Sequence, residues 1–170
     1  MSPGYFTYRQ PVASWDRTVA EPFVIEHVDH AGRAIPPSRS GHTRGWHPVR
    51  PGHGAIPFES GLERKVIDAL ISHASLTAIR SQPLTVFYRL GGKARRYTPD
   101  FVVQFDAVPT ALSILGFGAT TYLEVKPHTK TVEHMDELLQ RLAVIEAATR
   151  APAVLVTERD LHTLSKWGQR

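Results

Sequence analysis

Apolar and polar positions follow helical spacing in two long stretches of the chain. In residues 60–74, apolar side chains recur every three or four positions, which predicts a helix with Ser60 as its N-cap and Glu63 as a capping-box partner. The same spacing predicts a second helix over residues 133–149. A last short helix is expected over residues 160–167.

Shorter apolar segments with strand spacing lie between these helices. Gly91 and Gly92 separate two of them, which is a strong signal for a tight β-hairpin. The predicted strands cover residues 85–90, 93–105, 120–125 and 153–157. The last two are expected to be parallel, because a helix joins them. This order of elements predicts an α/β domain: a mixed β-sheet with a hairpin, flanked by helices.

Residues 1–57 are predicted to be an irregular N-terminal arm, because proline and glycine recur throughout them. A short apolar piece at residues 22–25 could form an edge strand. Five histidines in this range could bind a metal or phosphate, but none of them has persuasive helical ligand spacing, so a solvated arm is favoured. They are His27, His30, His42, His47 and His53. The folded domain is then expected to occupy residues 58–170.

Composition narrows the class of protein. The 170 residues suit one domain with a single core, and the absence of cysteine excludes disulfides and thiolate metal sites. No apolar run is long enough to span a bilayer, so no membrane partner and a cytoplasmic location are expected. The net charge is +4, and residues 58–130 hold nine basic and six acidic side chains. This mild excess permits a polyanionic partner without requiring one.

Glu63 is the first candidate for chemistry. At about 100° per residue it falls inside the apolar stripe of its helix, near Leu62, Val66 and Leu70. A carboxylate on a buried face is costly unless it is paired, hydrogen-bonded or bound to a metal. A capping box would also satisfy Glu63, by folding its carboxylate back onto the helix N-terminus. Both interpretations stay open from the sequence alone.

Two further segments carry polar side chains in suggestive places. Asp100 follows Pro99 near the start of a strand, and Glu124 and Lys126 share one face of the next strand. Pro-Asp followed by Glu-x-Lys resembles the PD-(D/E)xK nuclease signature. That resemblance implies a metal site formed by Asp100, Glu124, the Val125 carbonyl and Glu63.

Oxygen donors of this kind favour Mg²⁺, for which Mn²⁺ is expected to substitute. In the same signature Lys126 would orient or help deprotonate the attacking water and stabilise charge on the phosphorane. Gln82 is a weaker candidate for positioning the water or a ligand. The implied catalytic set is Glu63, Gln82, Asp100, Glu124 and Lys126.

A narrower resemblance rests on four segments within residues 58–157. They are Ser60-Gly61-Leu62-Glu63, Gln82, Tyr97-Thr98-Pro99-Asp100-Phe101 and Glu124-Val125-Lys126-Pro127. Together they resemble the N-terminal catalytic domain of TnsA, the endonuclease subunit of heteromeric cut-and-paste transposases. The resemblance implies a restriction-endonuclease-like fold and Mg²⁺-dependent hydrolysis of double-stranded DNA. It also implies cleavage at the 5′ ends of a transposon, beside a DDE transposase that acts on the 3′ ends.

The family pattern leaves alternatives. TnsA proteins usually continue into a helical domain that contacts an AAA+ regulator, whereas about forty residues follow Lys130 here and are expected to complete the nuclease fold. A stand-alone restriction, repair or phage-type nuclease is one alternative function. A non-catalytic DNA-binding or assembly module is another, although all the expected polar residues are present.

Basic side chains near the hairpin are the candidates for contact with the DNA backbone. They are Arg80, Arg89, Lys93, Arg95 and Arg96. A solvated hairpin tip would explain them equally well. Phosphate contacts would depend steeply on salt and little on sequence. No base-reading helix-turn-helix pattern is present, so sequence specificity is expected to come from a partner.

Overall fold

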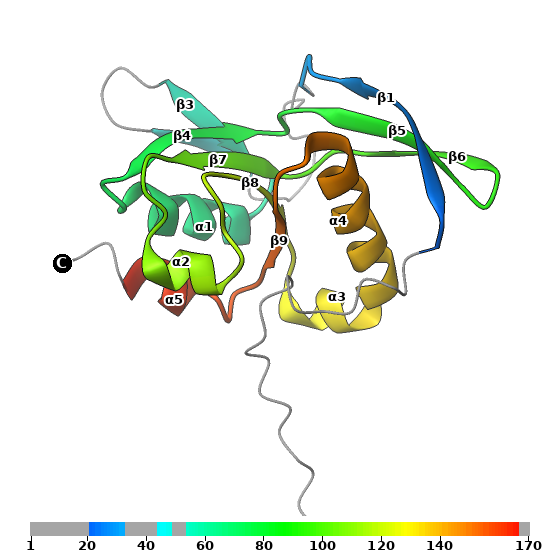
Figure 1. The fold of residues 1–170 in the computed structure, drawn as a ribbon. Helices are drawn as coiled ribbons and strands as arrows, with labels where there is room; N and C mark the ends of the chain where they lie inside the picture. The colour runs from blue at the N-terminus through cyan, green and yellow to red at the C-terminus, as the bar shows by residue number, and fades with distance from the viewer. Residues whose placement is uncertain (1–20, 33–43, 49–53, 167–170) are drawn as a thin grey trace, which may run out of the picture.

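A four-stranded mixed sheet forms the centre of the structure (Figure 1). The computed structural model describes residues 21–32, 44–48 and 54–166. The strand order is β4-β7-β8-β9, with β8 and β9 parallel and the other pairs antiparallel. These strands are β4 (Leu76–Ser81), β7 (Phe101–Phe105), β8 (Thr120–Val125) and β9 (Ala153–Val156). The predicted parallel pairing of the last two strands is confirmed.

A second, antiparallel sheet has the order β1-β5-β6. Its strands are β1 (Phe23–Asp29), β5 (Thr85–Leu90) and β6 (Lys93–Tyr97). The hairpin between β5 and β6 turns at Gly91 and Gly92, whose φ angles are 54° and 75°. Two consecutive residues with positive φ suit a turn whose twist matches the flanking strands. The predicted hairpin is therefore confirmed.

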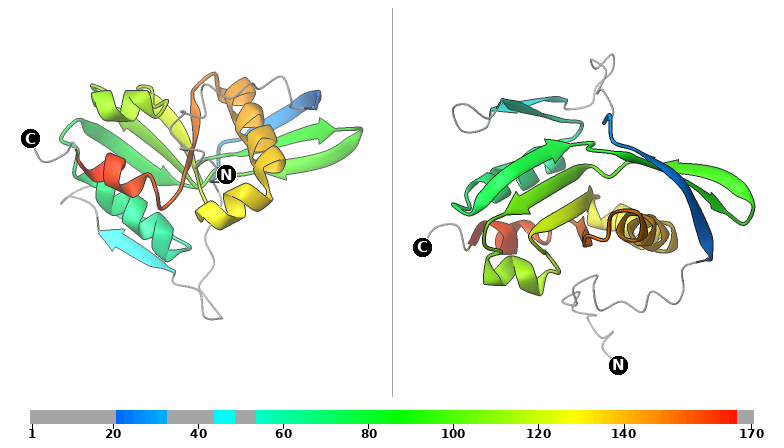
Figure 2. Two further views of the ribbon diagram at one scale, coloured as in Figure 1. Left: turned by 90° about the horizontal axis from the view of Figure 1, so that it is seen from below. Right: turned by 45° about the horizontal axis from the view of Figure 1, so that its top comes forward.

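The helices lie in two groups. They are α1 (Gly61–Ile71), α2 (Thr110–Ile114), α3 (His128–Glu133), α4 (Met135–Thr149) and α5 (Leu161–Lys166). Helices α1, α2 and α5 gather beside the four-stranded sheet (Figure 1). Helix α4 contacts β9, β1 and β5, and seen end-on it lies on the concave side of the curved hairpin sheet (Figure 2). It therefore joins the two sheets.

The predicted helices are confirmed with changed boundaries. Ser60 caps α1 as expected, because its hydroxyl accepts a hydrogen bond from the Glu63 N–H, but the helix ends at Ile71. The helix predicted over residues 133–149 begins at Met135, and α3 precedes it as a separate short helix.

The chain crosses between the two sheets at two neighbouring points. It leaves β4 for β5 at Gln82, and it leaves β6 for β7 at residues 98–100. The Gln82 N–H donates to the Asp100 carbonyl at 2.8 Å, so the two crossings are bonded together. The prediction of one return strand over residues 93–105 is wrong. Pro99 has no N–H for a ladder, which makes it a natural place for the strand to end.

Two apolar clusters fill the interior, one on each side of β8 and β9. Leu123 and Val125 belong to the cluster under α1 and α5. Tyr122 packs against the other cluster, which includes residues of α4 and the hairpin sheet. The predicted alternation along residues 120–125 is thus confirmed, and it directs Glu124 toward α4.

The prediction of an irregular arm over residues 1–57 needs correction. Within it lie β1, β2 (Gly45–Pro48) and β3 (Ala55–Phe58), and the last two pair as a separate two-stranded sheet. His47 is buried rather than solvated, and its Nε2 lies 2.6 Å from the Asp68 carboxylate on α1. His42 and His53 lie outside the described residues. The boundary at residue 58 stays a prediction.

Within residues 21–32, 44–48 and 54–166, no helix is both long and apolar enough to cross a membrane.

Replacing Gly92 with alanine should lower the free energy of unfolding by roughly 1 kcal/mol, because an L-residue at positive φ is strained. Apart from Gly92 and its two chain neighbours, no atom of the described residues lies within 4 Å of the position that the new Cβ would take, so the loss would come from the backbone and not from a clash. Urea denaturation of Gly92→Ala measures it. Gly92→Asn is the control and should lose less, since asparagine tolerates the left-handed region better. Equal stability of wild type and Gly92→Ala would contradict the turn geometry.

Candidate active site

Glu124 is the most deeply buried carboxylate of the site, with 2% of its surface exposed. Its Oε2 accepts a hydrogen bond from the Tyr97 hydroxyl. Its Oε1 lies 2.8 Å from the Lys126 Nζ and 4.0 Å from the Arg141 Nη1. Because a buried carboxylate must be paired or hydrogen-bonded, these three side chains explain how the fold accommodates its charge. The predicted proximity of Glu124 and Lys126 is confirmed.

Asp100 lies beside this pair at the crossing between the sheets. Its backbone N–H donates to the Leu123 carbonyl at 2.9 Å, and its Oδ2 accepts from the Val125 N–H at 2.7 Å. The same Oδ2 is 3.8 Å from the Lys126 Nζ. Backbone bonds to β8 therefore fix the carboxylate of Asp100 next to the Glu-x-Lys segment. The two motifs come together as the sequence predicted.

The charge balance around Asp100 favours its protonated form in the protein alone. Burial and the neighbouring Glu124 carboxylate raise the pKa of Asp100 from 3.8 to about 8, although Lys126 opposes the shift. Two carboxylates held close together in a poorly hydrated site repel each other. A cation placed between them would relieve this repulsion.

Lys126 is a stable cation in this environment. Burial alone would lower the pKa of its ammonium group, but the carboxylates of Asp100 and Glu124 raise it above the ordinary value. The side chain keeps 34% of its surface exposed, so it remains accessible from solvent. A lysine held in its charged form stabilises negative charge better than it removes protons.

Glu63 is buried on α1 as the helical pattern predicted, and its carboxylate makes contacts of the capping type. Its Oε1 accepts from the Ser60 hydroxyl at 3.0 Å, and its Oε2 accepts from the Glu59 N–H at 2.8 Å. Burial raises the pKa of Glu63, and Lys126 is close enough to lower it in part. Both interpretations from the sequence therefore describe part of its surroundings: the cap forms, and the carboxylate lies near the site.

Gln82 occupies the other crossing between the sheets with a φ angle of 43°, which is unusual for a residue with a side chain. Its Nε2 donates to the Glu59 Oε2 at 3.1 Å. Its Oε1 is buried and has no hydrogen-bond partner among the described residues. A buried carbonyl oxygen of this kind is an available acceptor, which fits the predicted role in positioning water or a ligand.

Two residues of this cluster were not singled out from the sequence. Tyr97 directly precedes Thr98-Pro99-Asp100, so its place in the motif was the available signal. Arg141 belongs to α4, and no short spacing connects it with Glu124. Its guanidinium lies 5.5 Å from the centre of the Tyr97 ring, a distance at which a cation interacts favourably with an aromatic face.

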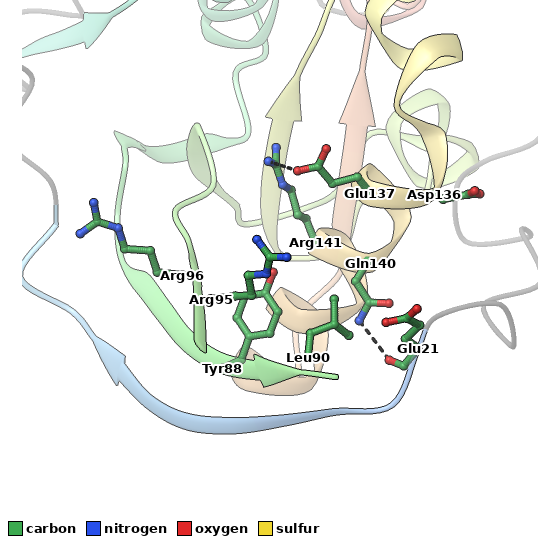
Figure 3. Close-up of a pocket in the computed structure, with 9 residues that line it drawn as sticks. All are labelled: Glu21, Tyr88, Leu90, Arg95, Arg96, Asp136, Glu137, Gln140 and Arg141. Atoms are coloured by element: carbon green, nitrogen blue, oxygen red, sulfur yellow. Dashed lines mark hydrogen bonds and ion pairs between the residues drawn. The ribbon is translucent and has the colours of Figure 1, made fainter. Parts of the chain in front are cut away.

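The structure separates the predicted DNA-binding residues into different settings. Arg95 and Arg96 line a pocket of about 440 Å³ between the hairpin and α4, together with Arg141 (Figure 3). Arg89 is paired with Glu26 at 2.6 Å. Arg80 belongs to β4, in the other sheet, and so is separate from the strands of the hairpin. Lys93 is exposed at the hairpin turn.

The predicted metal ligands are only partly brought together. Among the described residues, no group of three or more His, Cys, Asp or Glu side chains is arranged to hold a metal ion. Asp100 and Glu124 are adjacent, and both flank Lys126. Glu63 uses its oxygens in the cap, and Val125 contacts Asp100 through its N–H. The carboxylates of Asp100 and Glu124 are oxygen donors of the kind that Mg²⁺ prefers, so the chemistry of the site fits this ion.

One family model matches part of the sequence. The mixed sheets and flanking helices are those of a restriction-endonuclease-like α/β fold. Residues 73–154 match the family model described as TnsA-like endonuclease N terminal. No curated protein matches the sequence. The family match covers Gln82, Asp100, Glu124 and Lys126 but not Glu63, and it indicates an endonuclease-related role in DNA transposition.

The metal-free protein should lose stability as the pH rises from about 4 to about 8. Asp100 binds its proton more tightly when folded, so its contribution is fully present below the ordinary pKa of 3.8 and is lost as the pH passes about 8. Each unit of pKa difference corresponds to about 1.4 kcal/mol. Because Asp100 interacts strongly with the charges of Glu124 and Lys126, its full pKa shift does not appear as stability. We therefore expect the free energy of unfolding to fall on the order of 2–4 kcal/mol.

Urea denaturation in EDTA at several pH values measures this fall. Asp100→Asn should flatten the profile over the same range, because its side chain does not titrate. An unchanged slope in Asp100→Asn would show that another group is responsible.

Proposed function

We propose that this protein is a Mg²⁺-dependent endonuclease that hydrolyses phosphodiester bonds of double-stranded DNA. The observation that carries the proposal is the cluster of Asp100, Glu124 and Lys126, built at the crossing between two sheets. This cluster lies inside the segment that matches the TnsA-like family model. The intact set of polar side chains favours an enzyme over a non-catalytic DNA-binding module.

Asp100 and Glu124 would hold the divalent ion, with the Val125 carbonyl and Glu63 as further candidates. Bound Mg²⁺ lowers the pKa of a coordinated water and neutralises negative charge that develops on the phosphate. The raised pKa of Asp100 supports this assignment, because the pair of carboxylates lacks one compensating positive charge in the protein alone. Mn²⁺ should substitute, since it accepts the same oxygen donors.

Lys126 would act on the phosphate as a cation. Its raised pKa keeps the ammonium group charged, which suits it to stabilise a phosphorane and to orient the attacking water. The same charge makes it a poor general base. Gln82 would accept a hydrogen bond from water or a ligand through its unpartnered Oε1.

The family relationship supports a role at transposon ends. We propose that the protein cuts the 5′ ends while a DDE transposase subunit acts on the 3′ ends, with an AAA+ regulator as a third component. The family match favours this role over that of a stand-alone restriction, repair or phage-type nuclease.

Incubation of supercoiled plasmid with the protein and Mg²⁺ or Mn²⁺, alone and with a DDE transposase, tests the activity. Lys126→Ala and Asp100→Ala should each lower the cleavage rate at least about 100-fold, because they remove charge stabilisation and a metal ligand. Lys130→Ala is a matched control, since Lys130 is an exposed lysine whose ammonium group pairs with Glu133 on the surface. If wild type and Asp100→Ala are equally inert in every combination, the protein is not a nuclease.

Arg95 and Arg96 should contribute to DNA binding through phosphate contacts. Replacing both with alanine is expected to reduce the slope of log affinity against log salt by about 2, with little dependence on DNA sequence. Fluorescence anisotropy at several salt concentrations measures the slope. Arg89→Ala should change it less, because Arg89 is already paired with Glu26. An unchanged slope in the double variant would favour the solvated-hairpin interpretation.

A further inference from the structure

The two oxygens of the Glu124 carboxylate have different partners. Oε1 has two cations near it, Lys126 at 2.8 Å and Arg141 at 4.0 Å. Oε2 has one described partner, the Tyr97 hydroxyl. Because a donor is held at each oxygen, the carboxylate cannot rotate freely about its last bond, and its remaining lone pairs keep a fixed direction.

Tyr97 and Arg141 also contact each other. The Arg141 guanidinium lies 5.5 Å from the centre of the Tyr97 ring. One helical turn earlier, Glu137 pairs with Arg141 on the same side of α4 (Figure 3). Tyr97 is itself 7% exposed, at the end of β6. The carboxylate of Glu124 on β8 is thus oriented by side chains from two other elements, β6 and α4.

The two cations next to Oε1 differ in how free they are to move. Lys126 carries its charge on a flexible stem and 34% of its side chain is exposed, whereas the Glu137 carboxylate and the Tyr97 ring keep Arg141 in place. If Lys126 turns toward a DNA phosphate, Arg141 still leaves a positive charge beside the buried Glu124. The site would then not be left with an uncompensated buried carboxylate.

We propose that Tyr97 and Arg141 are positioning residues that hold the Glu124 carboxylate in the orientation in which it binds the divalent ion. The inference rests on the proposed function and goes beyond it, because neither residue belongs to the PD-(D/E)xK signature. Groups that hydrogen-bond to a metal-binding carboxylate orient it, and their removal typically weakens metal affinity 10- to 100-fold.

The test compares two single-atom deletions in the same apolar cluster. Tyr97→Phe removes the hydroxyl that donates to Glu124. Tyr88→Phe removes the hydroxyl of another buried tyrosine, on the neighbouring strand, for which no hydrogen bond to the site is seen among the described residues. Mn²⁺ binding, measured by calorimetry, should weaken about 10- to 100-fold in Tyr97→Phe and less than about 2-fold in Tyr88→Phe. Urea denaturation in EDTA shows whether both variants are folded.

Arg141 provides an independent pair of variants. Arg141→Gln should weaken Mn²⁺ binding because Glu124 loses a group that orients it, and Arg141→Lys should recover part of the loss because its ammonium group restores a charged donor beside Oε1. In DNA cleavage, the variants should need more metal for half-maximal rate, while the rate at saturating metal falls much less. A variant that merely disrupts packing would not be rescued by added metal.

The outcomes separate the two proposals. Wild type that neither binds Mn²⁺ nor cleaves DNA would overturn the proposed function, and the inference with it. Wild type that binds Mn²⁺, with Tyr97→Phe and Arg141→Gln binding it equally well, would overturn the positioning role alone. If Tyr97→Phe does not fold, the Arg141 pair decides: loss in Arg141→Gln with recovery in Arg141→Lys supports the role, and no loss contradicts it.

Discussion

The burial of the Glu124 carboxylate is the constraint on which the rest of the site depends. An anion with so little exposed surface is tolerated only where donors surround it, and here they come from three different elements. Tyr97 ends β6, Lys126 follows β8, and Arg141 lies on α4. The hairpin sheet, the central sheet and the helix between them must therefore be assembled together before the site exists.

The same assembly explains the place of Asp100. The chain passes between the two sheets at Gln82 and again at residues 98–100, and the two passages are joined by a backbone hydrogen bond. Asp100 therefore lies at the end of β8, where its carboxylate accepts a hydrogen bond from the Val125 N–H. Two carboxylates brought together in this way repel each other, and this repulsion adds to burial in raising the pKa of Asp100.

The sequence pattern predicted correctly those features that depend only on residues near one another in the chain. The cap at Ser60, the turn at Gly91 and Gly92, and the alternation along β8 depend on neighbouring residues, and all three were predicted correctly. The return strand over residues 93–105 was wrong, because a change of sheet leaves no mark on strand periodicity. The strands inside the predicted irregular arm were largely missed for a related reason. β1 is held by β5, a partner distant in the chain, whereas β2 and β3 pair with each other.

The sequence by itself determined which groups could do chemistry: two acidic motifs, a lysine two residues after Glu124, and a glutamate on the apolar face of a helix. It also carried the resemblance to the TnsA-like family, which the family match over residues 73–154 confirms. The tertiary structure decided which of these groups meet. It placed Asp100 and Lys126 beside Glu124, engaged Glu63 in the cap of α1, and brought in Tyr97 and Arg141. Contacts between elements depend on how the two sheets and α4 pack, and that packing has no counterpart in the spacing of residues along the chain.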